Sequence, residues 1–173
     1  MKQKTLRVTL IGICTALSMI FSYIEFLIPF NFGIPGIKLG LSNIVIIVLF
    51  NVLNPVSALI VGLLRVFLSG LLFGTILSTI FSLSGFLFSF ATLFLFSYFN
   101  VKHRDLFSIA GISVVCACFH TFGQLLAAAF VTDFSLLTLY LPVIEAASVV
   151  AGLITGFLSE TIIERISHND WLC

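Results

Sequence analysis

The sequence predicts an all-α integral membrane protein: a compact bundle of six transmembrane helices with both termini in the cytoplasm. Three observations predict this fold class. Hydrophobic residues make up 60% of the 173 residues and charged residues only 9%, whereas soluble domains carry about 25% charged residues. Long apolar runs recur along the chain, and Lys and Arg gather in alternate connections between them. Because so few polar side chains cannot cover a water-exposed surface, we expect the helices to lie in a lipid bilayer.

The first three predicted helices follow one another closely. A run of about 17–25 apolar residues is long enough to cross the hydrocarbon core of a bilayer. The first run, residues 6–28, follows a short basic stretch and is too long for the apolar region of a signal peptide, so we expect a retained helix. The second run, residues 39–53, is short and ends at Asn54 and Pro55, and the third covers residues 56–72.

The last three predicted helices have less uniform boundaries. They are expected over residues 77–99, 106–131 and 141–163. A polar stretch at residues 100–105 separates the fourth helix from the fifth. Only two glycines and a threonine within residues 70–75 mark the break between the third and the fourth, so one broken segment is the alternative there. We expect the six helices to form a single transmembrane domain over residues 1–173.

The positions of the basic residues predict the orientation. With six spans, both termini lie on one side of the membrane. That side carries Lys2, Lys4, Arg7, Lys102, Arg104 and Arg165. Among the loop positions of the other side there is only Lys38. Because basic loops stay on the cytoplasmic side, we expect both termini there.

Five polar side chains stand within the apolar runs and are candidates for a binding site. Such groups are costly in lipid and usually face the interior of a bundle. Glu25 and Glu145 lie near the predicted outer ends of the first and sixth helices, and Arg65 lies about halfway along the third. His120 and Gln124 are four residues apart and therefore share one face of the fifth helix. We predict a cavity that is open to the outside and binds a small polar or amphipathic molecule.

The connection over residues 29–38 is rich in Gly and Pro and faces the outer side. Irregular backbone at membrane depth is tolerated only where protein or a water-filled cavity surrounds it. We therefore expect either a structured loop folded over the cavity or an exposed surface loop. Asn31, Lys38 and Asn43, in and just after this connection, complete the predicted substrate-binding set. Each has an alternative role without a ligand. Glu25 and Lys38 could be solvated at the membrane surface, Arg65 could pair with Glu25 or Glu145 to hold helices together, and His120 with Gln124 could form hydrogen bonds between helices.

Small residues form two rows along the first helix. One row holds Gly12 and Ala16, and the other holds Cys14, Ser18 and Ser22. Rows of small residues let helices approach closely. Gly12 and Ala16 therefore serve either packing within the bundle or docking onto a partner membrane protein.

Several chemistries lack their usual sequence signals. There is no phosphate-binding loop for ATP, and no cluster of carboxylates for Mg²⁺ and a diphosphate. No serine or cysteine nucleophile stands with a catalytic base in a recognisable arrangement. We therefore expect no catalytic residue, no metal ligand and no cofactor, and we expect that the protein is not an enzyme. The net charge of +1 indicates no nucleic-acid partner.

Six strings of residues resemble a known family. The resemblance covers nearly the whole chain, and its most specific parts are Pro-Gly-Ile-Lys-Leu-Gly and the string from Arg65 to the Leu-Phe-Gly that follows. Thr121 departs from the pattern, in which Asn is expected after His120. The strings lie at residues 24–29, 35–44, 63–74, 82–85, 120–124 and 140–142. The chain resembles the Gx transporter family, which is also labelled heptaprenyl diphosphate synthase component I.

This family is similar in size and span count to the S-components of energy-coupling factor (ECF) transporters. The resemblance implies a bacterial plasma-membrane protein that binds a micronutrient, or a cofactor or quinone precursor, at its outer face. It implies as partners a shared transmembrane subunit, which contacts Gly12 and Ala16, and two ATPases. It also implies that residues 29–38 form a lid. The alternative is a membrane component associated with synthesis of heptaprenyl diphosphate, the menaquinone side chain. A third reading is an anchor for a redox complex.

Overall fold

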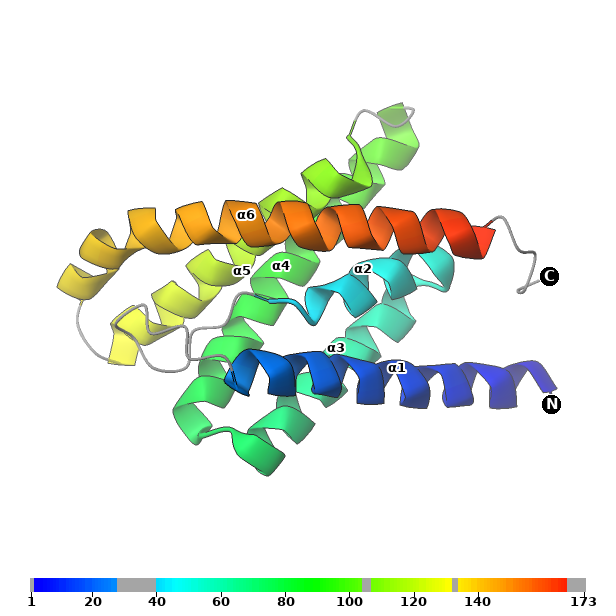
Figure 1. Ribbon diagram of the computed structural model, residues 1–173, viewed down its shortest axis with the longest axis horizontal. Helices are drawn as coiled ribbons and strands as arrows, with labels where there is room; N and C mark the ends of the chain where they lie inside the picture. Colours follow the sequence, from blue (N-terminus) through cyan, green and yellow to red (C-terminus); the bar gives the residue numbers. More distant parts are fainter. Residues whose placement is uncertain (1, 28–39, 104–106, 132–133, 168–173) are drawn as a thin grey trace.

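The computed structural model describes residues 2–27, 40–103, 107–131 and 134–167 (Figure 1). All regular structure within these ranges is helical, as the sequence predicts. The helices are α1 (Lys2–Leu27), α2 (Asn43–Val52), α3 (Pro55–Phe73), α4 (Ile76–His103), α5 (Ile109–Val131) and α6 (Phe134–Ser167).

Five of the six helices are long and apolar enough to cross a membrane, and α2 is the exception. The predicted second helix covered residues 39–53, but α2 has only 10 residues. At 1.5 Å per residue it is about 15 Å long, roughly half of the hydrocarbon thickness. The described part of the chain therefore has five helices of spanning length and one short apolar helix.

A tight turn sets the start of α2. Gly40 has a φ of 87°, which favours glycine because a side chain is strained there. Its carbonyl accepts the Asn43 N–H at 2.9 Å, and the Leu41 carbonyl accepts the Ile44 N–H at 3.1 Å. This turn uses the first residues of the apolar run, so the helix begins later than its hydropathy indicates.

Side-chain caps separate the helices that follow. Asn54 Oδ1 accepts the Ser57 N–H at 2.7 Å and Pro55 stands in the first turn, so α3 begins directly after α2. At the next break, Thr75 Oγ1 accepts the Ser78 N–H at 3.1 Å, while Ser78 Oγ accepts the Thr75 N–H at 2.9 Å. This reciprocal cap starts α4. The third and fourth predicted helices are therefore two helices and not one broken segment.

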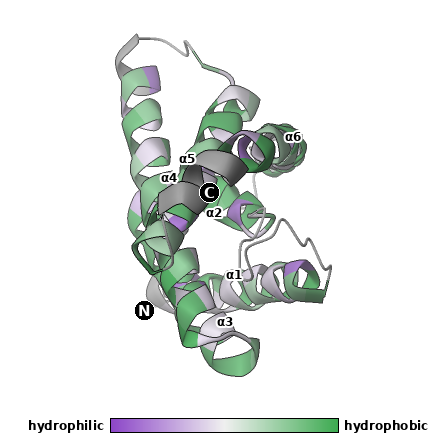
Figure 2. Cartoon of the chain, turned by 90° about the vertical axis from the view of Figure 1, so that its left-hand side faces the viewer, coloured by the Kyte–Doolittle hydropathy of each residue, from purple (hydrophilic) through white to green (hydrophobic). Residues whose placement is uncertain are grey.

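The helices pack around α2. Helix α5 packs against α4 and α6, α1 packs mainly against α3, and α2 contacts α3 and α6. Figure 2 shows α2 between the α1–α3 pair and α6. The start of α1 and the end of α6 lie at the same end of the bundle, on the right in Figure 1, and the α3–α4 turn lies at the opposite end.

Glycines let α5 approach both neighbours closely. A Cβ on Gly85 of α4 would lie 2.7 Å from the His120 carbonyl oxygen, and a Cβ on Gly152 of α6 would lie 2.7 Å from Val114 Cα. Such distances to backbone atoms leave no room for a side chain. Close approach of this kind is typical of helix packing in membranes.

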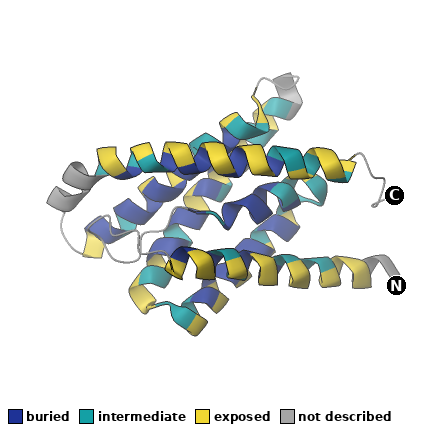
Figure 3. Ribbon diagram, in the orientation of Figure 1, coloured by how far each residue is buried: buried dark blue, intermediate teal, exposed yellow. Residues whose placement is uncertain are grey.

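The distribution of polarity is the reverse of that in a soluble domain. Many large apolar residues of α1, α4 and α6 are exposed. Figure 2 shows that hydrophobic residues predominate along the helices, and Figure 3 shows exposed positions recurring along α1 and α6. Leu71 and Ile76, at the α3–α4 turn, are more than 80% exposed. In contrast, Glu25, Arg65 and His120 are all at most 5% exposed. An apolar exterior around buried charges fits a multi-pass membrane protein.

Candidate functional site

Glu25 lies near the C-terminal end of α1 and is 5% exposed. Its Oε1 atom accepts the Gly40 N–H at 2.5 Å and the Leu41 N–H at 2.8 Å. A carboxylate that accepts two backbone N–H groups forms strong charge-assisted hydrogen bonds. Glu25 therefore ties the turn before α2 to α1, and one of its oxygens is occupied by this structural contact.

Arg65 lies about halfway along α3 and is 3% exposed. Its Nη1 atom donates to Ser42 Oγ, directly before α2, and to Ser22 Oγ of α1 at 3.3 Å. The Glu25 carboxylate also interacts electrostatically with the guanidinium. Three segments that are distant in sequence thus meet at Arg65, and a negative charge compensates this buried cation in part.

His120 and Gln124 lie one turn apart on α5 and are completely buried. The His120 Nε2 and Gln124 Nε2 atoms are 3.0 Å apart and hydrogen-bonded. A Cβ on Gly40 would lie 3.5 Å from His120 Cδ2 and 2.8 Å from Asn43 Nδ2. The Gly40 turn therefore lies next to the His120 imidazole. Glu25 holds the same turn from the side of α1.

Asn43 is the first residue of α2 and is buried at the same turn. The structure thus gathers five predicted site residues around the start of α2. We call these residues the interior polar cluster: Glu25, Asn43, Arg65, His120 and Gln124.

The other three predicted site residues are not part of this cluster. Glu145 lies on α6 beside the Cys118 thiol of α5. Among the described residues no contact joins Glu145 to the interior polar cluster. Asn31, Lys38 and the predicted lid at residues 29–38 lie outside the described residues.

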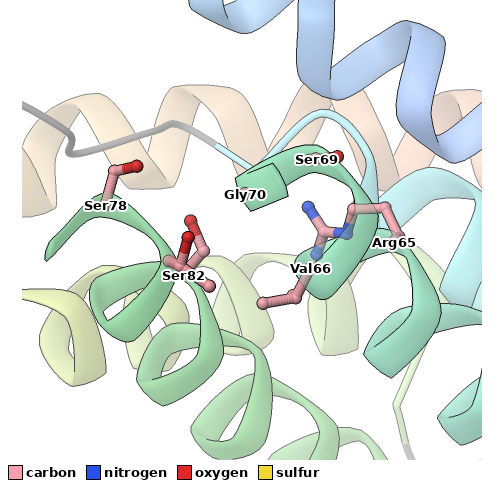
Figure 4. A pocket seen from close by; sticks show the side chains of 7 residues that line it. Arg65, Val66, Ser69, Gly70, Ser78 and Ser82 are labelled. Atoms are coloured by element: carbon pink, nitrogen blue, oxygen red, sulfur yellow. The ribbon is translucent and has the colours of Figure 1, made fainter. Parts of the chain in front are cut away.

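A small pocket, partly open to the outside, lies beside Arg65 between α3 and α4. The Arg65 guanidinium extends from α3 toward Ser82 of α4, with Ser69 nearby (Figure 4). The pocket is lined by Arg65, Val66, Ser69, Gly70, Ser78, Thr79 and Ser82. Of these, sequence reasoning singled out only Arg65 as a binding residue. Serine and threonine are frequent in membrane helices, so a single sequence carries no signal that distinguishes those that line a pocket.

The two rows of small residues on α1 have different surroundings. Ser18 and Ser22 are buried, and Cys14 packs against the core. Gly12 and Ala16 are exposed, and a Cβ on Gly12 would meet nothing within 4 Å. Packing within the described part of the bundle therefore uses the serine row and leaves the Gly12–Ala16 face open.

The described part of the chain holds no group of three or more His, Cys, Asp or Glu residues arranged for a metal ion. The interior polar cluster and the adjacent pocket provide hydrogen-bond donors, one guanidinium group and a concave surface. These features suit the binding of a small molecule.

Comparison with known proteins identifies the family. A family described as heptaprenyl diphosphate synthase component I matches residues 14–162, which is most of the chain. No curated protein and no solved structure matches it. The family label inferred from the strings around Lys38 and Arg65 is confirmed, while the similarity to ECF S-components stays a prediction. The chain belongs to the heptaprenyl diphosphate synthase component I family.

Proposed function

We propose that this protein is a membrane subunit that binds a small molecule for an ATP-driven importer of the energy-coupling factor type. The observation that carries the proposal is the buried Arg65, which borders a small pocket inside the bundle. A membrane anchor has no need for such a group, because a buried cation inside a bilayer is costly. A binding subunit needs it to hold a polar part of its ligand.

The position of the pocket suits uptake. Ser78 and Thr79 lie at the start of α4, close to the α3–α4 turn, and this turn lies at the end opposite the start of α1 and the end of α6 (Figure 1). In the orientation that the basic residues favour, the termini are cytoplasmic and the pocket is nearer the outer surface. The ligand then enters from outside the bacterial cell.

Helix α1 supports a role within a larger complex. One side of it contributes Glu25 to the interior polar cluster and Ser22 as a hydrogen-bond acceptor for Arg65, while the Gly12–Ala16 face is open. In this proposal a transmembrane subunit, itself coupled to two ATPases, packs against that face. Contact there is transmitted along α1 to the groups that surround Arg65.

The test is gentle purification of the tagged chain from its native membrane, followed by mass spectrometry of bound small molecules and bound proteins. We expect one small molecule in stoichiometric amount and an ATPase module. Active transport by this chain alone in proteoliposomes would contradict the proposal, and so would a preparation with neither ligand nor ATPase.

The family description favours a second candidate, a non-catalytic membrane component of heptaprenyl diphosphate synthesis. This candidate predicts association with a soluble prenyl transferase. Deletion of the gene should then change the length or yield of the prenyl product. Unchanged prenyl products together with lost uptake of a small molecule would leave the importer subunit as the function.

A further inference from the structure

Arg65 uses only part of its hydrogen-bonding capacity within the described structure. Nη1 donates to Ser22 and Ser42, whereas Nε and Nη2 have no partner among the described residues. Buried donors without acceptors are unfavourable, and donors on a charged group more so. The Nε–Nη2 edge of a guanidinium presents two parallel N–H groups, which match the two oxygens of an oxyanion.

Two hydroxyl groups beside this edge are also unused. Ser69 Oγ and Ser82 Oγ are buried and have no partner within the described residues. Two buried serines of α6, in contrast, satisfy their hydroxyls within their own helix. Ser148 donates to the carbonyl four residues earlier at 2.9 Å, and Ser159 does so at 2.7 Å. Both unused hydroxyls line the pocket next to Arg65, as Figure 4 shows.

The charge of the pocket lining limits the ligand. Arg65 is the one charged side chain among the described residues that line it. The Glu25 carboxylate already compensates this guanidinium in part, so the pocket can balance at most one further negative charge. A diphosphate carries more charge and is normally bound with Mg²⁺ and carboxylates.

We propose that this pocket binds the carboxylate group of the ligand, with Arg65 Nε and Nη2 donating to its two oxygens and with Ser69 and Ser82 as further donors. The inference rests on the proposed function for the role of that ligand as cargo. It adds that the cargo is a small carboxylic acid and not a prenyl diphosphate.

The experiment measures binding of acetate, inorganic phosphate and pyrophosphate to the full chain in lipid nanodiscs. Each salt replaces chloride at constant ionic strength, and binding is followed by isothermal titration calorimetry and by the shift of the unfolding midpoint. We expect acetate to bind in the millimolar range and more tightly than pyrophosphate. No binding of acetate beyond chloride would overturn the inference, and tighter binding of pyrophosphate would overturn the assignment to a carboxylate.

Two serine variants on α4 make a matched pair. Ser82→Ala removes a hydroxyl that has no partner, so we expect acetate binding to weaken about tenfold with unchanged stability of the ligand-free protein. Ser84→Ala removes the hydroxyl that donates to the Gly123 carbonyl at 2.8 Å, so we expect lower stability and unchanged acetate binding. Equal acetate affinity in Ser82→Ala, Arg65→Lys and the native chain would contradict the inference.

The outcome separates this inference from the proposed function. If acetate does not bind but the chain still co-purifies with an ATPase module and another ligand, only the carboxylate assignment is wrong. If acetate binds as described but no ATPase module associates, the pocket assignment stands and the importer role is wrong.

Discussion

The contact between Glu25 and the Gly40 turn gives a prediction about stability. In Glu25→Ala the N–H groups of Gly40 and Leu41 lose the acceptor that now lies at 2.5 and 2.8 Å. The same change removes a negative charge that interacts with Arg65. Glu25→Gln removes the charge but keeps a carbonyl oxygen that accepts hydrogen bonds.

The magnitude follows from the unsatisfied groups. A buried donor without a partner costs about 1–3 kcal/mol, so two donors cost about 2–6 kcal/mol. The uncompensated Arg65 adds to this cost. We expect Glu25→Ala to lower the free energy of unfolding by about 3–7 kcal/mol and Glu25→Gln by about 1–3 kcal/mol.

Equilibrium unfolding in mixed micelles measures these values. The protein is titrated with sodium dodecyl sulfate and its helix content is followed by circular dichroism. Glu164→Ala is the control, because Glu164 is an exposed residue of α6 and such surface changes are usually within ±0.5 kcal/mol.

A free energy of unfolding for Glu25→Ala within about 0.5 kcal/mol of the native value would refute this reasoning. It would mean that the backbone N–H groups of the turn find other partners at little cost. A loss in Glu25→Gln as large as that in Glu25→Ala would show instead that charge compensation of Arg65 dominates.

Three further changes test separate parts of the structure. Gly12→Leu should leave ligand binding and stability unchanged, because a Cβ there meets nothing within 4 Å. The same change should abolish uptake in cells, and loss of ligand binding as well would indicate misfolding. Gly40→Ala should lower the free energy of unfolding by about 1–3 kcal/mol, because φ is 87° and the new Cβ would lie 2.8 Å from Asn43 Nδ2; a melting midpoint equal to the native one would contradict this. Arg65→Ala should reduce affinity for the co-purified ligand at least tenfold in equilibrium binding; equal affinity would remove Arg65 from the site.

Residue patterns predicted the nature of the helices better than their ends. The apolar run at residues 39–53 predicted a membrane-crossing helix, yet only ten of these residues form α2. Hydropathy reports only the composition of a segment. Gly40 and Leu41 form the turn, but they do not lower the mean hydropathy of the run enough to reveal it. The break at Asn54 and Pro55, in contrast, has a local chemical cause and was predicted from the residues themselves.

The candidate site was predicted in part. Burial of Arg65, His120 and Gln124 follows from the cost of exposing such groups to lipid, which is a property of single residues. The contacts that these side chains make, in contrast, depend on other parts of the chain and could not be predicted from single residues. For Arg65 the sequence left both Glu25 and Glu145 open as partners, but the structure places its Nη1 against Ser42 and Ser22 and its charge near Glu25.

The sequence by itself determined that this protein is a helical membrane protein with costly polar groups inside, because the cost of placing a side chain in lipid depends on its own chemistry. Only the tertiary structure decided which of those groups meet. Helix α2 is short, and the turn before it meets Glu25, Arg65 and His120, while α3 and α4 place Ser69 and Ser82 beside Arg65. Such meetings depend on the rotation and depth of each helix, which are set by contacts among residues distant in the chain.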